Sequence, residues 1–437
     1  MRITRALLAH ARAALSRILR FDAPADQLLS AYFRQHRNLG QNDRAFVAQT
    51  VFAVLRRKRS LEAAAGSAEP EALVAAALIR VQGLSARALQ GLVDEALARR
   101  VRELDPGSLA PALRVDLPDW LWDRLERQHG ADEASRIAQG LLNPAPLDLR
   151  VNLARVDRAA AQAQLAADGV HAEGTPYSPA GLRVAGKPAI NRHRLFIDGL
   201  IEVQDEGSQL LAWLLAPRRG EMVADYCAGA GGKALAAAML MRGTGRIYAM
   251  DVSAKRLAAL APRAARAGVT NVHTLVLGAD DARVKRLAGK LDRVLVDAPC
   301  SGFGTLRRNP DLKWRHGPDA VAELAAKQRA ILDAAGRLLK PGGRLVYATC
   351  SILQEENDAV TTDFQRQHPE FAPVSCAELL AAQRIALDTG DRLRLLPHLH
   401  DTDGFYAAAF VRKFATTPGQ SRKMTPAFNN DDWANSN

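Results

Sequence analysis

The sequence predicts an α/β protein with a doubly wound, mostly parallel sheet in its C-terminal half, preceded by an all-helical region and a small α/β connector. Strand-like and helix-like segments alternate from about residue 206, as they do in parallel sheets. Residues 1–140 instead carry apolar residues at helical spacing. The segment Asn143-Pro144-Ala145-Pro146 lies between the two patterns and indicates a linker. The expected divisions are a helical domain (1–142), the connector (143–205), the sheet domain (206–415) and a disordered tail (416–437).

The composition is that of a water-soluble protein with a basic N-terminal part. The 437 residues are enough for two or three domains, and 48% hydrophobic and 24% charged residues are ordinary values. The net charge is +12, and residues 1–60 hold twelve Lys or Arg against three acids. This excess favours a polyanionic partner such as nucleic acid. A general bias toward arginine in the genome is the alternative.

The cysteine pattern and the lack of long apolar runs argue against a zinc-binding protein and against a membrane protein. No two cysteines form a CxxC pair, which argues against a structural zinc site and predicts a reducing, cytoplasmic compartment. No apolar run approaches the ~20 residues of a membrane span, so no membrane partner is expected. The four cysteines are Cys227, Cys300, Cys350 and Cys376.

The N-terminal residues 1–24 are rich in arginine and contain no acid before Asp22, as a transit peptide would be. Their apolar residues recur at helical spacing and the pattern continues beyond, so we predict a structural helix. A second helix is predicted over 43–52, with Asn42 or Asp43 as its N-cap. It leads into the basic cluster Arg56–Arg59, where a structural role at a helix end and RNA contact both remain open.

The remaining elements follow from apolar patterning. In the connector we predict strands at 147–152, 181–185 and 195–203 and a helix at 157–168, an order of ferredoxin or RNA-recognition type. In the sheet domain the predicted parallel strands are 222–226, 246–250, 272–277, 294–296 and 345–348, the helices include 254–267 and 319–339, and 392–396 with 405–413 form a closing antiparallel pair.

A glycine-rich loop follows the first predicted strand of this sheet. Glycines at that turn let the backbone approach a ligand closely, and Asp251 at the end of the second strand suits two ribose hydroxyls. Gly229, Gly231 and Gly232 do not give the GxGxxG spacing of a dinucleotide loop, which favours S-adenosyl-L-methionine. After the third strand, Asp280 and Asp281 could reach the adenine side or cap a helix.

Two thiols lie just beyond the ends of the fourth and fifth strands. Cys300 follows a buried strand that ends in Asp297, and Cys350 follows the next strand. Ligands of open sheets bind beyond the carboxyl ends of the strands, so both thiols should face the crevice beside the cofactor. A disulfide between them is disfavoured in a reducing cell.

This constellation suits the methylation of carbon 5 of cytosine. That carbon becomes nucleophilic enough only after a thiolate has added to carbon 6 of the ring. Asp297 could hold the ring nitrogen and the exocyclic amine, and a second thiol could assist when the first is expelled. The base must be unpaired or flipped to be reached.

The segment 304–315, which follows the Pro-Cys loop, carries four cations and Trp314. Its Arg307, Arg308 and Lys313 are candidate RNA contacts, although Trp314 could instead tuck inward. His398, His400 and Asp401 have no further His or Cys nearby, so no metal is expected.

The motifs resemble those of the RNA cytosine-carbon-5 methyltransferases of the Sun/RsmB/Nop family. The resemblance covers Gln204 to about Lys413 and rests on VQDEGS (203–208), CAGAGGK (227–233), DAPCSG (297–302), TCS (349–351) and DGFY (403–406). It implies a class I methyltransferase fold, with Cys350 as the nucleophile and Cys300 assisting product release. It also implies that S-adenosyl-L-methionine is bound by Cys227, Ala228, Gly229, Ala230, Gly231, Gly232, Lys233, Asp251, Asp280 and Asp297.

The resemblance extends more weakly toward the N-terminus. Residues 147–152 are similar to the start of the family's substrate-side module, which implies Arg150 as an RNA contact, and residues 1–142 resemble the NusB-like RNA-binding domain of the RsmB branch. The cofactor loop departs from the family's Ala-Pro-Gly-Gly-Lys-Thr, since it reads GAGGKA at 229–234 and lacks the proline and the threonine. We expect a monomeric RNA 5-methylcytosine methyltransferase. Its substrate is expected to be 16S rRNA, and tRNA is the alternative. A DNA cytosine methyltransferase and a non-catalytic RNA-binding assembly factor are the rival readings.

Overall fold

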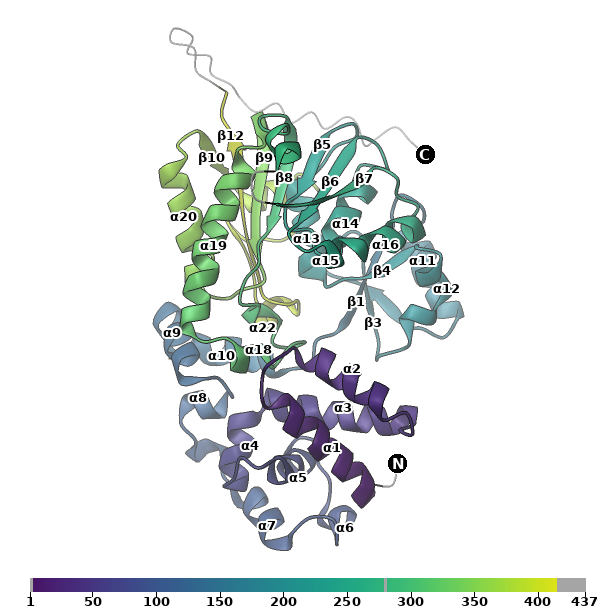
Figure 1. The fold of residues 1–437 in the computed structure, drawn as a ribbon, viewed down its shortest axis with the longest axis vertical. Helices are drawn as coiled ribbons and strands as arrows, with labels where there is room; N and C mark the ends of the chain where they lie inside the picture. Colours follow the sequence, from purple (N-terminus) through teal and green to yellow (C-terminus); the bar gives the residue numbers. More distant parts are fainter. Residues whose placement is uncertain (1–2, 279–280, 415–437) are drawn as a thin grey trace.

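The computed structural model describes residues 3–278 and 281–414 and confirms the predicted α/β class. A helical N-terminal region occupies the lower part of the view in Figure 1, and a four-stranded and an eight-stranded sheet lie above it. The predicted tail, 416–437, falls outside the described residues. None of the described helices is long and apolar enough to cross a lipid bilayer.

Ten α-helices and one 3-10 helix precede the first described strand. They are α1 (Arg5–Ile18), α2 (Ala25–Gln35), α3 (Gln41–Arg56), α4 (Lys58–Ala65), α5 (Pro70–Arg80), α6 (Ala86–Leu89), α7 (Glu95–Glu103), η1 (Pro106–Ser108), α8 (Pro111–Arg114), α9 (Asp119–His129) and α10 (Ala131–Leu142).

The first of these helices is a structural element, as predicted. Its apolar stripe, which includes Leu7, Ala11 and Leu15, is buried, and the Thr4 hydroxyl accepts a hydrogen bond from Leu7 N at 3.2 Å. The predicted N-cap of α3 is wrong, because this helix begins two residues earlier, after Gly40. Asp43 lies in its first turn, where its carboxylate accepts a hydrogen bond from Gly40 N at 3.2 Å.

Two separate apolar cores divide the helical region. Buried residues of α1–α7 form one core among themselves. Helices α8–α10 pack instead on the loops that follow two strands of the large sheet, with Trp122 and Leu125 in the same cluster as Phe303 and Leu353. The last three helices therefore share their core with the sheet domain.

The connector forms an antiparallel sheet of ferredoxin type. Its elements follow the order β1 (Leu147–Val151), α11 (Arg158–Ala167), β2 (Ala172–Gly174), β3 (Gly181–Val184), α12 (Arg194–Ile197) and β4 (Ile201–Val203), and the sheet order is β2-β3-β1-β4. The predicted strand 195–203 is partly wrong, because its first apolar residues belong to α12. Strand β2 was not predicted, since its three residues are mostly exposed and carry no apolar alternation.

The large sheet contains all five predicted parallel strands. They are β5 (Met222–Asp225), β6 (Arg246–Asp251), β7 (Val272–Val276), β8 (Leu291–Asp297) and β9 (Leu339–Thr349). The full order is β10-β12-β9-β8-β5-β6-β7, and β12 (Phe405–Arg412) runs antiparallel to β9. Strand β11 (Leu393–Leu395) pairs with β12, so the predicted closing pair is confirmed; β10 (Phe371–Val374) adds an edge that was not predicted.

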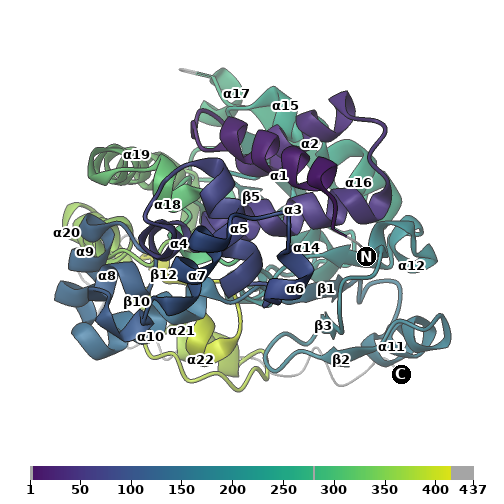
Figure 2. The ribbon, with the colours of Figure 1, turned by 90° about the horizontal axis from the view of Figure 1, so that it is seen from below.

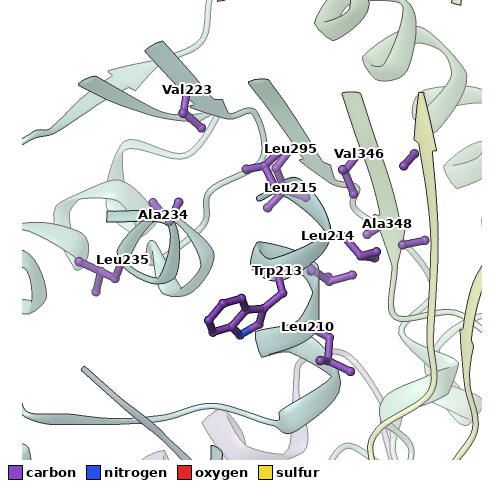
Figure 3. Packing of buried hydrophobic residues seen from close by; sticks show 14 of the residues in the cluster. Leu210, Trp213, Leu214, Leu215, Val223, Ala234, Leu235, Leu295, Val346 and Ala348 are labelled. Atoms are coloured by element: carbon purple, nitrogen blue, oxygen red, sulfur yellow. The ribbon is translucent and has the colours of Figure 1, made fainter. Parts of the chain in front are cut away.

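Helices cover both faces of this sheet, which explains the continuous apolar runs of its strands. Leu295 of β8 faces a core with α13 (Glu206–Leu215), α14 (Gly232–Leu240) and α21 (Cys376–Ala381), as Figure 3 shows for α13 and α14. Val294 and Val296 face the opposite core, with α19 (Pro318–Gly336) and α20 (Asp358–Gln367). The predicted helix 254–267 is two helices, α15 (Ala254–Ala258) and α16 (Leu260–Ala267).

The strand order places a binding crevice at one point of the sheet. From β5 the chain runs outward through β6 and β7, and then returns to the other side of β5 as β8 and β9. Ligands of doubly wound sheets bind at such a reversal, beyond the carboxyl ends of the strands. The glycine-rich loop and both predicted thiol loops leave the sheet there.

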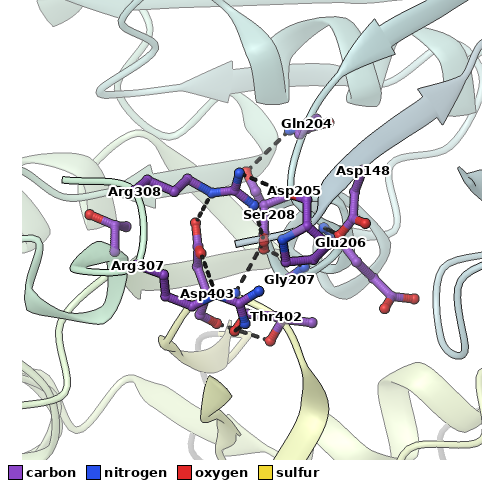
Figure 4. A network of polar contacts seen from close by, with 12 residues as sticks. Asp148, Gln204, Asp205, Glu206, Gly207, Ser208, Arg307, Arg308, Thr402 and Asp403 are labelled. Atoms are coloured by element: carbon purple, nitrogen blue, oxygen red, sulfur yellow. Dashed lines mark hydrogen bonds and ion pairs between the residues drawn. The ribbon is translucent and has the colours of Figure 1, made fainter. Parts of the chain in front are cut away.

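A buried ionic network joins the connector to the large sheet (Figure 4). Arg308 bridges two carboxylates, with its Nη2 2.9 Å from Asp205 Oδ1 and its Nε 2.6 Å from Asp403 Oδ2. Burial, with repulsion from Asp205, raises the pKa of Asp403 to about 7, while Arg308 acts in the opposite direction. Arg183 extends the network from Asp148 (2.8 Å) in β1 to Asp401.

We expect Arg308→Gln to lower the free energy of unfolding by about 2–3 kcal/mol, because it removes the cation that lies between two buried carboxylates. Their side chains are only 7% (Asp205) and 4% (Asp403) exposed. The measurement is urea unfolding followed by circular dichroism. The matched control is Arg194→Gln, which breaks the exposed pair with Asp198 and should change stability by less than about 0.5 kcal/mol. Equal stability of the two variants would contradict a structural role for the bridge.

Candidate active site

The two predicted thiols lie side by side at the edge of the large sheet. Strands β8 and β9 are adjacent and parallel, with Asp297 opposite Ala348, so their loops leave the sheet at the same level. The Sγ atoms of Cys300 and Cys350 are 3.4 Å apart and both cysteines are free. The structure therefore brings together two residues that are 50 positions apart in the sequence.

The carboxylate of Glu356 fastens the two thiol loops to each other. It accepts hydrogen bonds from Ser301 N (2.8 Å) and Ser301 Oγ (2.5 Å) of one loop, and from Ser351 Oγ (2.5 Å) of the other. Gln328 of α19 donates to the same carboxylate at 3.0 Å and to Pro299 O at 2.9 Å. Glu356 is fully buried, so these donors take the place of water.

Asn357 makes a second set of contacts on the Cys350 side. Its side chain accepts a hydrogen bond from Thr349 Oγ1 at 2.5 Å and donates to Ser351 O at 3.0 Å. Sequence reasoning missed both Glu356 and its neighbour. The run Gln354-Glu355-Glu356-Asn357 shows no periodicity that would identify which acid points inward.

The environment keeps Cys300 protonated. Its hydrogen-bonding contact with Cys350, and then its desolvation in the crevice, raise its pKa well above that of an ordinary thiol. The fourth cysteine, Cys376, is fully buried in the core between α21 and the sheet, with its Sγ 3.7 Å from Ala407 O. Cys376 is thus a packing residue, away from the thiol pair.

Asp297 is paired with a lysine from the glycine-rich loop. The Nζ of Lys233 lies 2.5 Å from Asp297 Oδ2. Burial alone would lower the pKa of Lys233, but Asp297 and, more weakly, Asp225 and Cys350 outweigh it and raise that pKa. The lysine charge is therefore retained beside both the carboxylate and the thiol.

A second carboxylate, which sequence reasoning did not single out, lies beneath this pair. Asp225, the last residue of β5, is 2% exposed, and its carboxylate oxygens have no well-formed hydrogen bond in the part of the chain that the structure describes, although the backbone N–H of Ala234 lies close enough to lower its pKa slightly. Burial and the charge of Asp297 raise its pKa to about 7, and Lys233 acts in the opposite direction. A buried, unpartnered carboxylate in a crevice marks a place for a cationic or donor group.

The glycine-rich loop, Cys227–Lys233, is held by two arginines from outside it. Arg263 donates to Ala230 O at 2.7 Å, and Arg150 of β1 donates to Gly232 O at 2.8 Å. Gly231 has φ +79° and a Cβ there would collide with Leu260, so the position requires glycine. These anchors order a loop that lacks the proline of the family pattern. Ala234, in place of the family's threonine, is fully buried in the core.

Of the three acids considered for ribose and adenine contacts, the structure places Asp251 beside the glycine-rich loop, 227–233. Asp251 accepts hydrogen bonds from Gly229 N (2.9 Å) and Ser253 N (2.7 Å) at the end of β6. Asp281 caps α17 (Ala282–Lys285), and its hydrogen bonds with Arg283 lower its pKa to about 2. Asp280, the predicted cofactor residue, lies outside the described residues.

The structure places the side chains of the predicted RNA contacts, in the 304–315 segment and in β1, against other parts of the protein. Arg150, Arg307 and Lys313 are buried, with 4%, 2% and 3% exposure, and donate to protein carbonyls: Arg150 to Gly232 O, Arg307 to Thr402 O and Lys313 to Arg56 O. Arg308 is occupied by its two carboxylates. Trp314 turns inward and donates to Leu55 O at 2.8 Å, which was the alternative reading. The segment thus docks the sheet domain onto α3.

The basic cluster that ends α3 is mostly structural. Arg56 donates to Arg307 O at 2.9 Å, Lys58 pairs with Glu62 at 2.6 Å and Arg59 pairs with Asp119 at 2.7 Å. The histidines of the 398–401 segment are also engaged, since His398 contacts Glu133 at 2.8 Å. Within residues 3–278 and 281–414, no three His, Cys, Asp or Glu side chains are grouped to hold a metal ion.

The sheet order, with antiparallel β12 inserted beside β9 and a glycine-rich loop at the end of β5, defines a Rossmann-like class I methyltransferase. A profile described as "16S rRNA methyltransferase RsmB/F" matches residues 212–411, and one for the ferredoxin-like domain of RsmF/B-like methyltransferases matches 117–191. The latter match begins well before residue 143, the predicted start of the connector.

Individual relatives agree with these matches. A probable ribosomal RNA small subunit methyltransferase B of Synechocystis sp. is 31% identical over 90% of this chain and 96% of its own length. Its counterpart in Bacillus subtilis is 36% identical over 69% and 68%. The crystal structure of a methyltransferase homolog protein from Pyrococcus horikoshii aligns with a TM-score of 0.60 and 30% identity, over 71% of this chain and all of that one. The chain belongs to the RsmB/F family of methyltransferases and is an enzyme.

We expect Glu356→Ala to lower the free energy of unfolding by about 3 kcal/mol or more, because it strands the buried donors of both thiol loops. Glu356→Gln keeps one acceptor oxygen and should fall between this variant and the wild type. The matched control is Glu355→Ala, which removes a half-exposed partner of Arg124 and should cost less than about 0.5 kcal/mol. Urea unfolding measures all three, and a Glu356→Ala protein as stable as the control would refute the clamp.

Proposed function

We propose that this methyltransferase transfers a methyl group from S-adenosyl-L-methionine to carbon 5 of a cytosine in RNA, through a covalent adduct with Cys350. The observation that carries the proposal is the pair of thiols 3.4 Å apart at the ends of adjacent strands. Asp297 lies at the end of one of these strands, at the reversal point where ligands bind. The small-subunit rRNA named for the relatives is the first candidate substrate, with tRNA second.

The residues of the crevice fit the cofactor. S-Adenosyl-L-methionine supplies an electrophilic methyl group on a sulfonium and carries an ammonium group. Asp225 and Asp297 offer negative charge in the crevice, Asp251 suits the ribose hydroxyls, and the loop 227–233 allows close backbone approach. The unpartnered oxygens of Asp225 are the specific support for a cationic ligand.

The chain's own residues then account for the chemistry. Cys350 Sγ bonds to carbon 6 of the ring, and the displaced electron pair makes carbon 5 the nucleophile that takes the methyl group. Asp297, held by Lys233, would accept a hydrogen bond from the exocyclic amine and pass the thiol proton of Cys350 to the ring nitrogen, which neutralises the negative charge that the addition puts on the ring. The same proton returns to Cys350 when the thiol leaves. Loss of the carbon 5 proton then expels Cys350 and restores the aromatic ring.

The thiol pair gives Cys300 a role that changes during the cycle. In the free enzyme its contact with Cys350 is the largest cause of its raised pKa. When Cys350 is bonded to carbon, that contact no longer opposes ionisation of Cys300. A larger fraction of Cys300 is then the thiolate, the form that can accept the carbon 5 proton when this proton must leave, which supports a role in product release.

We expect Cys350→Ala to abolish methyl transfer and to form no covalent complex, whereas Cys300→Ala should accumulate an RNA–protein adduct. The readout is methyl incorporation from labelled cofactor together with denaturing gel electrophoresis of the protein–RNA mixture. Small-subunit rRNA, tRNA and DNA are tested in parallel arms, and incorporation into DNA alone would support the rival DNA methyltransferase. Cys376→Ala serves as a thiol control that leaves the pair intact. A stable adduct from Cys350→Ala would reverse the assignment of the two thiols.

We expect the affinity for S-adenosyl-L-methionine to rise several-fold between pH 6 and pH 7.5. Asp225, with a pKa of about 7, is mostly neutral at the lower pH, and a cationic ligand favours its ionised form. Asp225→Asn should bind more weakly and lose this pH dependence, while Asp388→Asn, an exposed control, should retain it. Isothermal titration calorimetry gives both quantities. Absence of binding by the wild type at every pH would refute S-adenosyl-L-methionine as the methyl donor.

A further inference from the structure

Three arginines line one pocket in the helical region, far along the chain from the thiol loops. The pocket measures about 330 Å³, lies where α4 contacts α5, α7 and α8, and is lined by Arg57, Arg80 and Arg114. These helices are adjacent in Figure 2. No aspartate or glutamate is among the lining residues. A concave site with three guanidinium groups and no acid favours an anionic ligand.

Most of the hydrogen-bonding capacity of these arginines is unused. Arg80 donates through one nitrogen to Val101 O (2.8 Å) and Leu104 O (3.0 Å), which fixes its position. Arg114 donates through one nitrogen to Leu109 O at 3.1 Å and Gly107 O at 3.4 Å. The side chain of Arg57 donates to none of the groups in residues 3–278 and 281–414. Each guanidinium carries five N–H donors, so the pocket has donors to spare for a ligand with several acceptor oxygens.

Arg57 differs in this respect from its neighbours in the basic cluster. Arg56, Lys58 and Arg59 each have a carbonyl or carboxylate partner. The charge of Arg57 acts on Asp116, whose two oxygens already accept hydrogen bonds from Ser60. Burial first, and then the charges of Arg56 and Arg57, lower the pKa of Lys313 to about 7. Asp116 offsets part of the positive potential around Arg57, but it is not among the residues that line the pocket.

Apolar side chains complete the lining. Leu61, Leu104 and Leu109 lie among the arginines, so the site combines cations with an apolar surface. Its volume is at the lower end of the ~300–1,000 Å³ of small-ligand sites. A phosphate with its ribose and base presents the same combination of charged oxygens and apolar faces. Arginine also matches phosphate oxygens in a bidentate manner.

We infer that this pocket binds a backbone phosphate of the RNA substrate, with the attached nucleotide resting on the leucines. The inference rests on the proposed function, because the RNA is the polyanion that this enzyme must hold. It assigns to the helical region a defined contact, in place of the buried cations of the 304–315 segment. A free phosphate compound shares the chemistry, and the experiment separates the two sources.

The test uses the full-length protein with Arg57→Gln and Arg57→Lys, which replace a side chain that makes no hydrogen bond within residues 3–278 and 281–414. Arg219→Gln, an exposed arginine of the sheet domain, is the control with the same change in net charge. Filter binding to small-subunit rRNA over a salt series should show about tenfold weaker binding for Arg57→Gln. The slope of log K against log salt should fall by about 0.7–0.9 for one lost phosphate contact. Arg57→Lys should keep most of the salt dependence but bind RNA more weakly, because lysine keeps the positive charge and lacks the bidentate guanidinium.

The outcomes are distinguishable. Equal RNA affinity and salt slope for Arg57→Gln and Arg219→Gln overturn the inference. A second result would also overturn the inference. In it, inorganic phosphate stabilises the wild type but not Arg57→Gln in a thermal-shift assay, while both proteins bind RNA with equal affinity. RNA binding by the wild type without methyl incorporation overturns the proposed reaction and leaves the pocket assignment standing. No RNA binding by the wild type overturns both.

Discussion

The site depends on one buried carboxylate more than on any other group. Two loops that each carry a thiol leave adjacent strands, and strand pairing alone fixes their distance only up to the last residues of the sheet. Beyond that point Glu356 holds them, because Ser301 and Ser351 share its oxygens. A fully buried acid that accepts from both sides tolerates little relative movement of the loops. The short distance between Cys300 and Cys350 is thus a property of the scaffold behind them.

The cofactor loop is supported in a comparable way by residues of another module. Arg150 belongs to the antiparallel connector sheet, yet its guanidinium meets the carbonyl of Gly232. Arg263, from α16, holds Ala230 and also pairs with Glu202 of the connector at 2.8 Å. A displacement of the connector would therefore also move the glycine-rich loop, 227–233.

Much of the fold could be predicted because the parallel strands are buried on both faces and read as short apolar runs, Val294-Leu295-Val296 being the clearest. The thiols could be placed because each follows such a run. The burial of the cations could not be predicted. Lys and Arg side chains are mostly exposed in proteins, and nothing in the local sequence indicates that Arg307 and Lys313 are buried. The segment 195–203 failed for another reason: its apolar start fits a helix and a strand equally, and only packing chooses.

Helices α8–α10 cannot be separated from the large sheet without exposing part of its core. Their core includes Phe303 and Leu306, which follow directly on the Cys300 loop, and Leu353, which follows the Cys350 loop. A chain shortened to its large sheet would leave these side chains facing water beside the thiols, an apolar surface open to aggregation. The shortest fragment that we expect to fold with an intact site therefore begins before α8. During synthesis from the N-terminus, helices α8–α10 are made before the thiol loops that they cover.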